Sequence, residues 1–346
     1  MIEATLAATS PVFTVDGELV RDLARDCVHL EVAEDVAGLR TLEARFLATG
    51  AGATGPQAQL MHVDGDTVDL GRSLVVALGP EVAQRVVFDG AVSALELLLG
   101  DGDPPVVAVH AEDALMRLRM TRRCRTYTDV TDADVAADVA RAHGLTADVD
   151  ADGPRYDVVQ QVNQSDLAFL RERARLIRAE LWCTGRTLHF RSREARAGTE
   201  LTLVRGAELL SARLVADRKQ VIDKRAGPEV VEKETVSGRV GARLVATALG
   251  ESTSLRVREV ALTAGEAAAC ARAEMLRRGR CFVTVTGTTN GSPDMVVGSR
   301  LTLQDVGPAF DGGGYCVTAL RHTFDLRRGF RTRFTAERAT LNEVPA

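Results

Sequence analysis

The sequence contains little lysine, few aromatic residues and no long apolar run. Lysine supplies only Lys219, Lys224 and Lys233 of the 43 basic residues, and aromatic residues make up 4% of the chain. A surface that stacks on nucleotide bases or sugars needs aromatic platforms, so this scarcity argues against such binding. No segment reaches the ~20 apolar residues that span a bilayer. No basic run leads into an apolar stretch at the start, so we expect synthesis and folding in the cytoplasm.

The sequence also lacks the signatures of common catalytic and cofactor sites. No Gly-Lys dipeptide is present, which excludes a P-loop, and neither G-x-S-x-G nor H-E-x-x-H occurs. The six cysteines form no C-x-x-C pair and the six histidines stand alone. We therefore predict no catalytic residue, no metal site and no cofactor. Carboxylates are abundant, and a sequence does not report the carboxylate separation that glycoside hydrolysis needs, so that chemistry stays open.

The overall balance of residues is that of a soluble folded protein. Hydrophobic residues make up 45% of the chain and charged residues 26%. The 346 residues leave room for two or three domains. The net charge of -5 provides no general attraction for a polyanion, so we expect no nucleic acid recognition and no membrane insertion.

The first 115 residues predict antiparallel β structure. Apolar and polar residues alternate over residues 72–78 and 84–92, and a β-branched run follows at residues 106–110. Glycine-rich turns separate these runs. We predict a tube-like β-barrel domain over residues 1–115.

The pattern over residues 116–195 predicts a small α/β domain. Thr131 and Asp134 have the spacing of a capping box, in which each side chain accepts a hydrogen bond from the backbone N–H of the other residue. After Ser165, apolar residues recur at spacings of three and four. The predicted elements are helices at residues 132–143 and 167–181 and strands at residues 182–184 and 187–190.

Residues 196–346 return to β structure and predict a second tube-like barrel. The predicted strands lie at residues 201–204, 209–215, 282–286, 300–304, 315–320 and 330–335. Thr263 and Glu266 predict the start of a helix over residues 264–278. The charged stretch at residues 217–241 predicts a solvated excursion.

The two β regions echo one another. The segment L-G-R-S-L at residues 70–74 resembles V-G-S-R-L at residues 297–301. The segment F-D-G leading to V-S-A-L at residues 88–95 resembles F-D-G leading to V-T-A-L at residues 310–320. The order is kept although the spacing differs, which suggests a duplicated barrel.

Three stretches, in order along the chain, resemble the phage late control protein D family. The first runs from H-A-E-D-A-L-M-R-L-R at residues 110–119 to A-R-A-H-G-L at residues 140–145. The second is Y-D-V-V-Q followed by N-Q-S-D-L-A-F-L-R within residues 156–171, and the third covers the closing strands at residues 298–338. The positions that carry the resemblance are Tyr156, Gln160, Asn163, Ser165, Asp166, Phe169, Gly298, Gly314, Tyr315, His322, Phe324 and Thr332.

This resemblance implies a baseplate hub of a contractile phage tail or contractile injection system, similar to the hub part of the type VI secretion spike protein. It implies an α+β, mainly β fold, with two tube-like antiparallel β-barrels and a small α/β domain between them. It also implies a homotrimer that acts as a symmetry adaptor between a threefold spike protein and a hexameric inner tube protein, beside baseplate wedge proteins. The expected function is structural and not enzymatic. A tail-associated peptidoglycan hydrolase is the alternative.

The sequence departs from the family pattern in two places. The acidic-Gly segment that often ends the family's second helix is replaced by L-I-R-A-E-L-W at residues 176–182, which leaves the geometry after that helix open. The given sequence also has no segment for an oligonucleotide-binding fold or a β-helical needle, so we expect the spike to be a separate protein.

Overall fold

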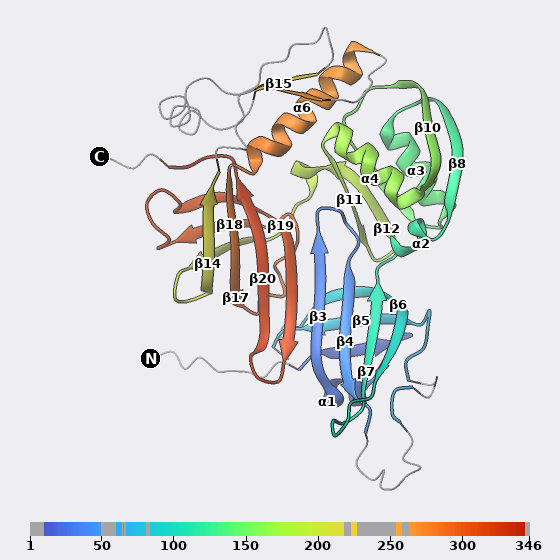
Figure 1. Ribbon diagram of the computed structural model, residues 1–346, viewed down its shortest axis with the longest axis vertical. Helices are drawn as coiled ribbons and strands as arrows, with labels where there is room; N and C mark the ends of the chain where they lie inside the picture. The colour runs from blue at the N-terminus through green and yellow to red at the C-terminus, as the bar shows by residue number, and fades with distance from the viewer. Residues whose placement is uncertain are drawn as a thin grey trace.

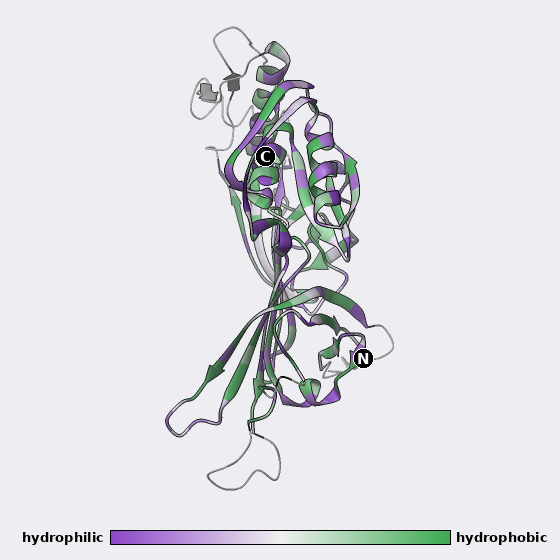
Figure 2. Ribbon diagram, turned by 90° about the vertical axis from the view of Figure 1, so that its right-hand side faces the viewer, coloured by the Kyte–Doolittle hydropathy of each residue, from purple (hydrophilic) through white to green (hydrophobic). Residues whose placement is uncertain are grey.

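Strands dominate the computed structural model, which describes residues 10–49, 60–63, 65, 67–80, 84–217, 223–226, 254–257 and 263–342. One sheet of thirteen strands contains strands from both ends of the chain. The helices α3, α4 and α6 lie at one end of the molecule, whereas the short α1 lies at the other (Figures 1 and 2). The predicted mainly β class is confirmed. Most of the predicted charged excursion lies outside the described residues.

The first β half, residues 12–112, is an antiparallel sheet in the spatial order β3-β4-β7-β6-β5-β1-β2. The long strand β6 belongs to two layers, because its first part pairs with β5 and its second part, from Ala91, pairs with β7. The elements are β1 (Val12–Val15), β2 (Glu18–Leu19), α1 (Arg21–Asp26), β3 (Cys27–Asp35), β4 (Thr41–Leu47), β5 (Ser73–Leu78), β6 (Arg85–Leu98) and β7 (Val106–Glu112).

The second β half, residues 200–338, has the order β14-β17-β20-β19, and β19 also pairs with β18, which pairs with β13. The long strand β19 again belongs to two layers, with Cys316 at the change of partner. The elements are β13 (Glu200–Val204), β14 (Leu209–Ala216), β17 (Val283–Asn290), β18 (Arg300–Gln304), β19 (Gly312–Asp325) and β20 (Gly329–Arg338).

The hydrogen-bond ladders of the two halves match strand for strand. β3, β4, β5, β6 and β7 correspond to β14, β17, β18, β19 and β20, with bulges at equivalent positions. In one half Val92 lies opposite Ala111, and in the other Val317 lies opposite Ala336. One difference is that β1 pairs with β5 antiparallel, whereas β13 pairs with β18 parallel.

Part of the sequence echo falls on equivalent places of these ladders, namely the glycines and the V-S-A-L and V-T-A-L segments. The two F-D-G segments do not, because the ladder equivalent of Gly90 is Tyr315 and not Gly312. The amide of Gly71 donates to the Val92 carbonyl at 2.9 Å, and the amide of Gly298 donates to the Val317 carbonyl at 2.9 Å. Both glycines have a positive φ, near +81° and +92°, which glycine adopts at little cost. Gly71 and Gly298 therefore form equivalent turns, one leading into β5 and the other into β18.

The structure does not show the predicted closed barrels. Each half is a sheet that bends back over its own core, and no pair among the described strands joins its two ends. The reason is that the outer edge of β3, which would have to close the first half, pairs with β19 of the second half.

The middle unit, residues 116–192, confirms both predicted helix starts. Thr131 and Asp134 form the capping box of α3, and the Ser165 hydroxyl accepts from the Ala168 amide at the start of α4. The elements are α2 (Met116–Arg119), β8 (Arg122–Val130), α3 (Asp132–Ala142), β9 (Thr146–Asp150), β10 (Tyr156–Ser165), α4 (Asp166–Ile177), β11 (Ala179–Thr184) and β12 (Thr187–Ser192).

Helix α4 is shorter than the apolar spacing predicted. It ends at Ile177 because Arg178 adopts a left-handed conformation, with φ near +65°. Leu181, the last residue of the predicted apolar stripe, lies instead in β11 opposite Phe190. Further elements are η2 (Arg193–Ala195), β15 (Asp223–Ala226), β16 (Ser254–Val257) and α6 (Ala264–Arg280), the last close to its predicted range.

Buried apolar residues form three core clusters, one under each β half and one in the middle unit. Phe324 and Phe330 come from the second half but pack in the cluster of the first half. The two halves are therefore joined by side-chain packing as well as by hydrogen bonds.

Candidate functional site

The two β halves meet at a seam, defined here as the pairing of β3 with β19. Seven aligned pairs form it, from Ala319 opposite Asp35 to Asp325 opposite His29. Side chains alternate between the two faces of a sheet. On the core side, His322 and Phe324 are 3% and 7% exposed. On the other side, the Arg321 guanidinium contacts the Glu31 carboxylate at 2.5 Å.

At one end of the seam lies a buried ionic junction, which ties the three cores together. Arg196 is only 4% exposed and binds the carboxylates of Glu34 from β3 and of Glu180 from β11, the latter at 3.2 Å. Its guanidinium also lies 4.7 Å from the centre of the Trp182 ring. Arg40 donates to the second oxygen of Glu34 at 2.6 Å and 2.9 Å. Both oxygens of this buried glutamate are thus satisfied.

The junction continues into the second β half through Glu337 on β20. Arg193 forms an ion pair with Glu337, and the Cys281 thiol donates to the same carboxylate at 2.9 Å. Burial, followed by the charge of Glu337, raises the pKa of the Cys281 thiol to about 12. Burial alone would lower the pKa of the Arg193 guanidinium, but Glu337 and Cys316 together raise it above its ordinary value. Both groups are therefore held in single protonation states near neutral pH.

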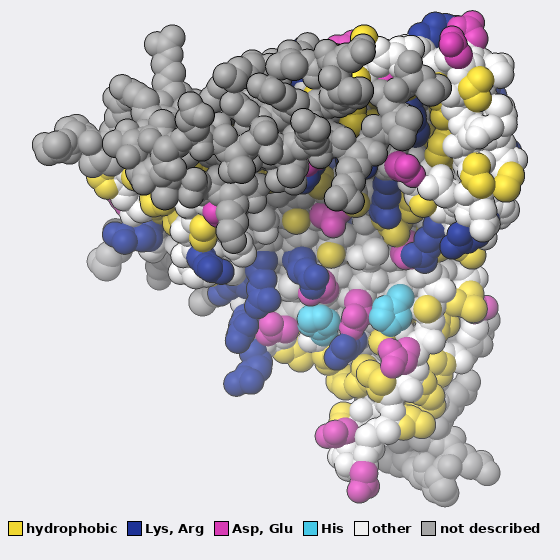
Figure 3. All heavy atoms as spheres, turned by 45° about the horizontal axis from the view of Figure 1, so that its top comes forward, with side chains coloured by type: hydrophobic (Ala, Val, Ile, Leu, Met, Phe, Trp, Pro, Cys, Tyr) yellow, Lys and Arg dark blue, Asp and Glu magenta, His cyan; other side chains and the backbone are white. Residues whose placement is uncertain are grey.

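The face of the sheet opposite the cores, here called the open face, carries small and charged side chains. In Figure 3, Lys and Arg side chains gather to the left of the lower, sheet-bearing part, and acidic and His side chains lie to their right. By strand alternation the first half contributes Glu31, Thr41, Glu43, Arg45, Glu96 and His110. The second half contributes Arg213, Thr284, Thr286, Arg321, Arg333 and Thr335.

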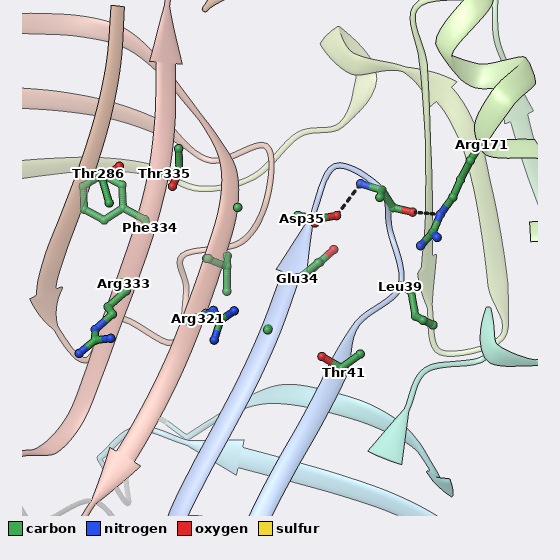
Figure 4. A pocket seen from close by; sticks show the side chains of 14 residues that line it. Glu34, Asp35, Leu39, Thr41, Arg171, Thr286, Arg321, Arg333, Phe334 and Thr335 are labelled. Carbon is green, nitrogen blue, oxygen red and sulfur yellow. Dashed lines mark hydrogen bonds between the residues drawn. The ribbon is translucent and has the colours of Figure 1, made fainter. Parts of the chain in front are cut away.

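A shallow groove of about 590 Å³ crosses the open face above the seam (Figure 4). Arg321 and Arg333 line it from the second half, and Thr41 lines it from the first. Asp35 accepts from the Ala37 amide at 2.7 Å, and Arg171 of α4 donates to the Ala37 carbonyl at 2.7 Å. The two carboxylates here, Asp35 and Glu34, are thus both engaged in holding the backbone and the junction.

Two kinds of feature are absent from the described residues, a metal-binding cluster and a membrane-spanning helix. No group of three or more His, Cys, Asp or Glu residues is arranged to hold a metal ion within that part of the chain. None of its helices has the length and apolar character to cross a membrane.

One family-motif residue, Asp166 at the start of α4, is the centre of a buried polar cluster. Asp166 is fully buried and accepts from His143 at 2.7 Å, from Arg123 at 2.9 Å and from Gln161 at 2.9 Å. Burial alone would raise its pKa, but the hydrogen bonds from His143 and Gln161 and the charge of Arg123 lower it below the ordinary value. The carboxylate stays ionised and fixes β10, β8 and α3 to the start of α4.

The other residues of this motif have separate places. The Tyr156 hydroxyl donates to Asp132 at 3.0 Å, and Phe169 stacks on Tyr127 with ring centres 6.2 Å apart. Asn163 lies at a bulge with φ near +50°. Gln160 is exposed, whereas its neighbour Gln161 is the buried one that binds Asp166. Sequence reasoning missed Gln161 because adjacent glutamines in a strand differ only in the face they occupy.

The C-terminal motif residues do not gather at one site. His322 contacts the Thr332 hydroxyl at 3.0 Å across the seam-bearing hairpin, and Phe324 packs into the first core. The remaining three are near β18. Tyr315 is fully buried, and its hydroxyl donates to the Phe310 carbonyl at 2.7 Å. Gly314, the residue before it in β19, has φ near +87°. Gly298 approaches Arg196 so closely that a Cβ would lie 2.6 Å from the Arg196 carbonyl oxygen.

The fold is similar to those of tail proteins of known structure. The 43 kDa tail protein of prophage MuSo2 from Shewanella oneidensis matches with a TM-score of 0.70 at 15% identity, over 96% of this chain and 98% of that one. A tail protein from Neisseria meningitidis MC58 matches with a TM-score of 0.69 at 13% identity, over 95% and 96%.

A third similar structure is the E. coli c3393 protein, described as a component of the type VI secretion system with structural similarity to the T4 tail proteins gp27 and gp5. It matches with a TM-score of 0.60 at 15% identity, over 93% of this chain and 76% of that one. No curated protein matches the sequence. The family model described as the Alg8 N-terminal domain matches residues 55–325, and this chain belongs to that family.

Proposed function

We propose that this chain is the structural hub of a phage tail or contractile injection baseplate, and that three copies form a ring. The observation that carries this proposal is the matched pair of ladders in one chain. A threefold assembly of such chains presents six near-equivalent surfaces, which is what a sixfold partner requires. The fold likeness to tail proteins over nearly the whole chain supports the same reading.

In this proposal each β half acts as one tube-like domain, residues 1–115 and 196–346, and the bent sheets of neighbouring halves complete the tube together. The open face lines the lumen, since its small and charged side chains suit a water-filled passage better than a packed contact. The middle domain, residues 116–195, lies outside the tube and meets wedge proteins of the baseplate.

The partners follow from the ring. A hexameric inner tube protein stacks on one end of it and a separate trimeric spike protein seats on the other. Assembly takes place in the cytoplasm, and the chain then remains part of the tail or injection particle. Its role is to adapt one symmetry to the other and involves no catalysis.

The experiment is to purify the full chain alone and with its candidate tube and spike proteins, and to measure mass by light scattering and shape by electron microscopy. We expect a ring of three chains that binds both partners. A chain that stays monomeric at high concentration with both partners present contradicts the proposal. Lysis of purified bacterial cell walls by the chain would instead support the hydrolase.

A further inference from the structure

The two strands that correspond to those of the seam, β6 and β14, do not pair with each other within the chain. In the seam, the second part of β19 pairs with the outer edge of β3. The equivalent of β19 is β6, whose second part, from Ala94 to Leu98, pairs only with β7 among the described strands. The equivalent of β3 is β14, which pairs only with β17 in the described part of the chain. The molecule thus has the two strands of a second seam, on edges that do not meet each other.

Burial differs at equivalent positions in the way an unmade seam predicts. His322 and Phe324 on β19 are 3% and 7% exposed. By the ladder register the equivalent of His322 is Leu97, which is 39% exposed. Continuing the register one residue past the end of β6 puts Leu99, which is 68% exposed, at the place of Phe324. Leucine is the more apolar side chain at the first position, yet it is the more exposed. An apolar residue at a free strand edge indicates a contact that is made elsewhere.

The charges at equivalent positions are complementary and reversed. Across the seam, Arg321 of β19 contacts Glu31 of β3. The equivalent of Arg321 is Glu96 on β6, and the equivalent of Glu31 is Arg213 on β14. Arg213 is exposed and has no acidic partner among the described residues, and the ion-pair contact of Glu96 is with His110 at 3.6 Å. Glu96 on β6 and Arg213 on β14 therefore occupy the two positions whose equivalents form the ion pair of the seam, with the acid and the base exchanged.

We propose that β6 of one copy pairs antiparallel with β14 of the next copy, in the register of the seam. Leu97 then lies opposite Leu214, Leu98 opposite Arg213, and Glu96 reaches Arg213 diagonally, as Arg321 reaches Glu31. The occupant of each free edge is a second copy of this chain. The contact is head to tail, so it repeats until the ring closes. That the ring holds three copies rests on the proposed function, whereas the strand pair, register and ion pair do not.

The first test is a charge exchange in the full chain, read by mass in solution. Glu96→Arg and Arg213→Glu each place like charges in the contact, and we expect each to weaken assembly by roughly tenfold or more, because like charges across a contact are costly. The double variant E96R/R213E restores the pair with reversed polarity and should recover assembly. Glu18→Arg and Arg117→Glu, which change exposed residues away from both edges, are the matched controls and should assemble as the wild type does.

The second test reads the register directly. Residues opposite each other in an antiparallel pair have Cα atoms about 4.5–5.5 Å apart, within the range that a disulfide spans. L98C/R213C should form disulfide-linked oligomers under mild oxidation. T323C/E31C, at the equivalent pair inside the seam, should form the same bond within one chain and leave its mass unchanged.

The outcomes separate the two proposals. A wild-type ring that survives both single charge changes, or that gives no cross-link at L98C/R213C, overturns this contact and leaves the hub standing. A wild-type chain that remains monomeric overturns the hub and this contact together. A ring of a number other than three, cross-linked at this pair, supports the contact and contradicts the threefold hub.

Discussion

The two β halves share a backbone pattern and differ in the side chains that fill it. Gly90 in the first half corresponds to Tyr315 in the second, and Phe46 corresponds to Thr289. A Cβ at Gly90 would lie 2.3 Å from the Glu112 carbonyl oxygen and 2.7 Å from the Phe88 ring, so the first half has no room there for a side chain such as Tyr315. The two halves therefore share their ladder register and bulges, but different residues fill the two cores.

The largest expected effect lies where the halves are tied together. Arg196→Ala leaves Glu34 and Glu180 as buried carboxylates with one fewer cation each, and we expect a loss of about 3–5 kcal/mol of unfolding free energy. Denaturant unfolding measures it. The control is Arg141→Ala, since Arg141 is 76% exposed in its pair with Asp138 and such pairs contribute below about 1 kcal/mol. Equal losses in the two variants would contradict a structural role for the junction.

The next effect distinguishes the halves by pH. Burial, followed by the charge of Arg40, lowers the pKa of His322 from 6.5 to about 4. The unfolded chain therefore takes up this proton first, so stability falls as the pH drops from about 6.5 to about 4, by at most about 3 kcal/mol. His322→Leu imports the residue found at the equivalent Leu97 and removes this contribution. Parallel stability curves for the variant and the wild type over that pH range would show the idea to be wrong.

A smaller effect exchanges core residues between the halves. A Cβ at Gly287 would lie 2.6 Å from the Phe334 ring, whereas the equivalent positions of the first half hold Ala44 and Val109. Gly287→Ala alone should cost about 1–3 kcal/mol through overpacking. The double variant G287A/F334V, which copies the first half, should cost less than the sum of its single changes in thermal or denaturant unfolding. Additive losses would mean that the two cores are not interchangeable.

The smallest effect is expected at the exposed ion pair of the seam. Glu31→Gln should change the unfolding free energy by about 0.2–1 kcal/mol, because Arg321 is 58% exposed and water screens the pair. A double-mutant cycle with Arg321→Met isolates the pair. A coupling well above this range would indicate that the seam depends on charge more than on its backbone pairs.

Local signals predicted local structure well. The Thr131–Asp134 capping box and the Ser165 cap placed α3 and the start of α4, because a cap depends on residues within one turn. The predicted end of α4 was wrong. Apolar spacing alone does not distinguish a continuing helix from the start of a strand, and here Leu181 pairs with Phe190 in a sheet.

Long-range features were beyond the reach of the pattern. The seam joins residues almost 300 positions apart, and an alternating strand does not name its neighbour. Arg196 and Glu34 are of residue types that usually lie on the surface, and they are buried because they pair with each other. The sequence alone does not reveal that pairing. The internal echo was the one sequence signal with long range. Its glycine and V-x-A-L parts fall on equivalent positions, but its F-D-G part does not, because Gly90 is equivalent to Tyr315.

The seven pairs of the seam also determine how the molecule bears load. A force that slides one half along the strand direction must break all seven pairs at once, while a force that lifts one strand from the other breaks them in turn. A thrust directed along β3 and β19 therefore meets the stiffer direction of the seam, and a sideways pull on the hairpin tip meets the weaker one.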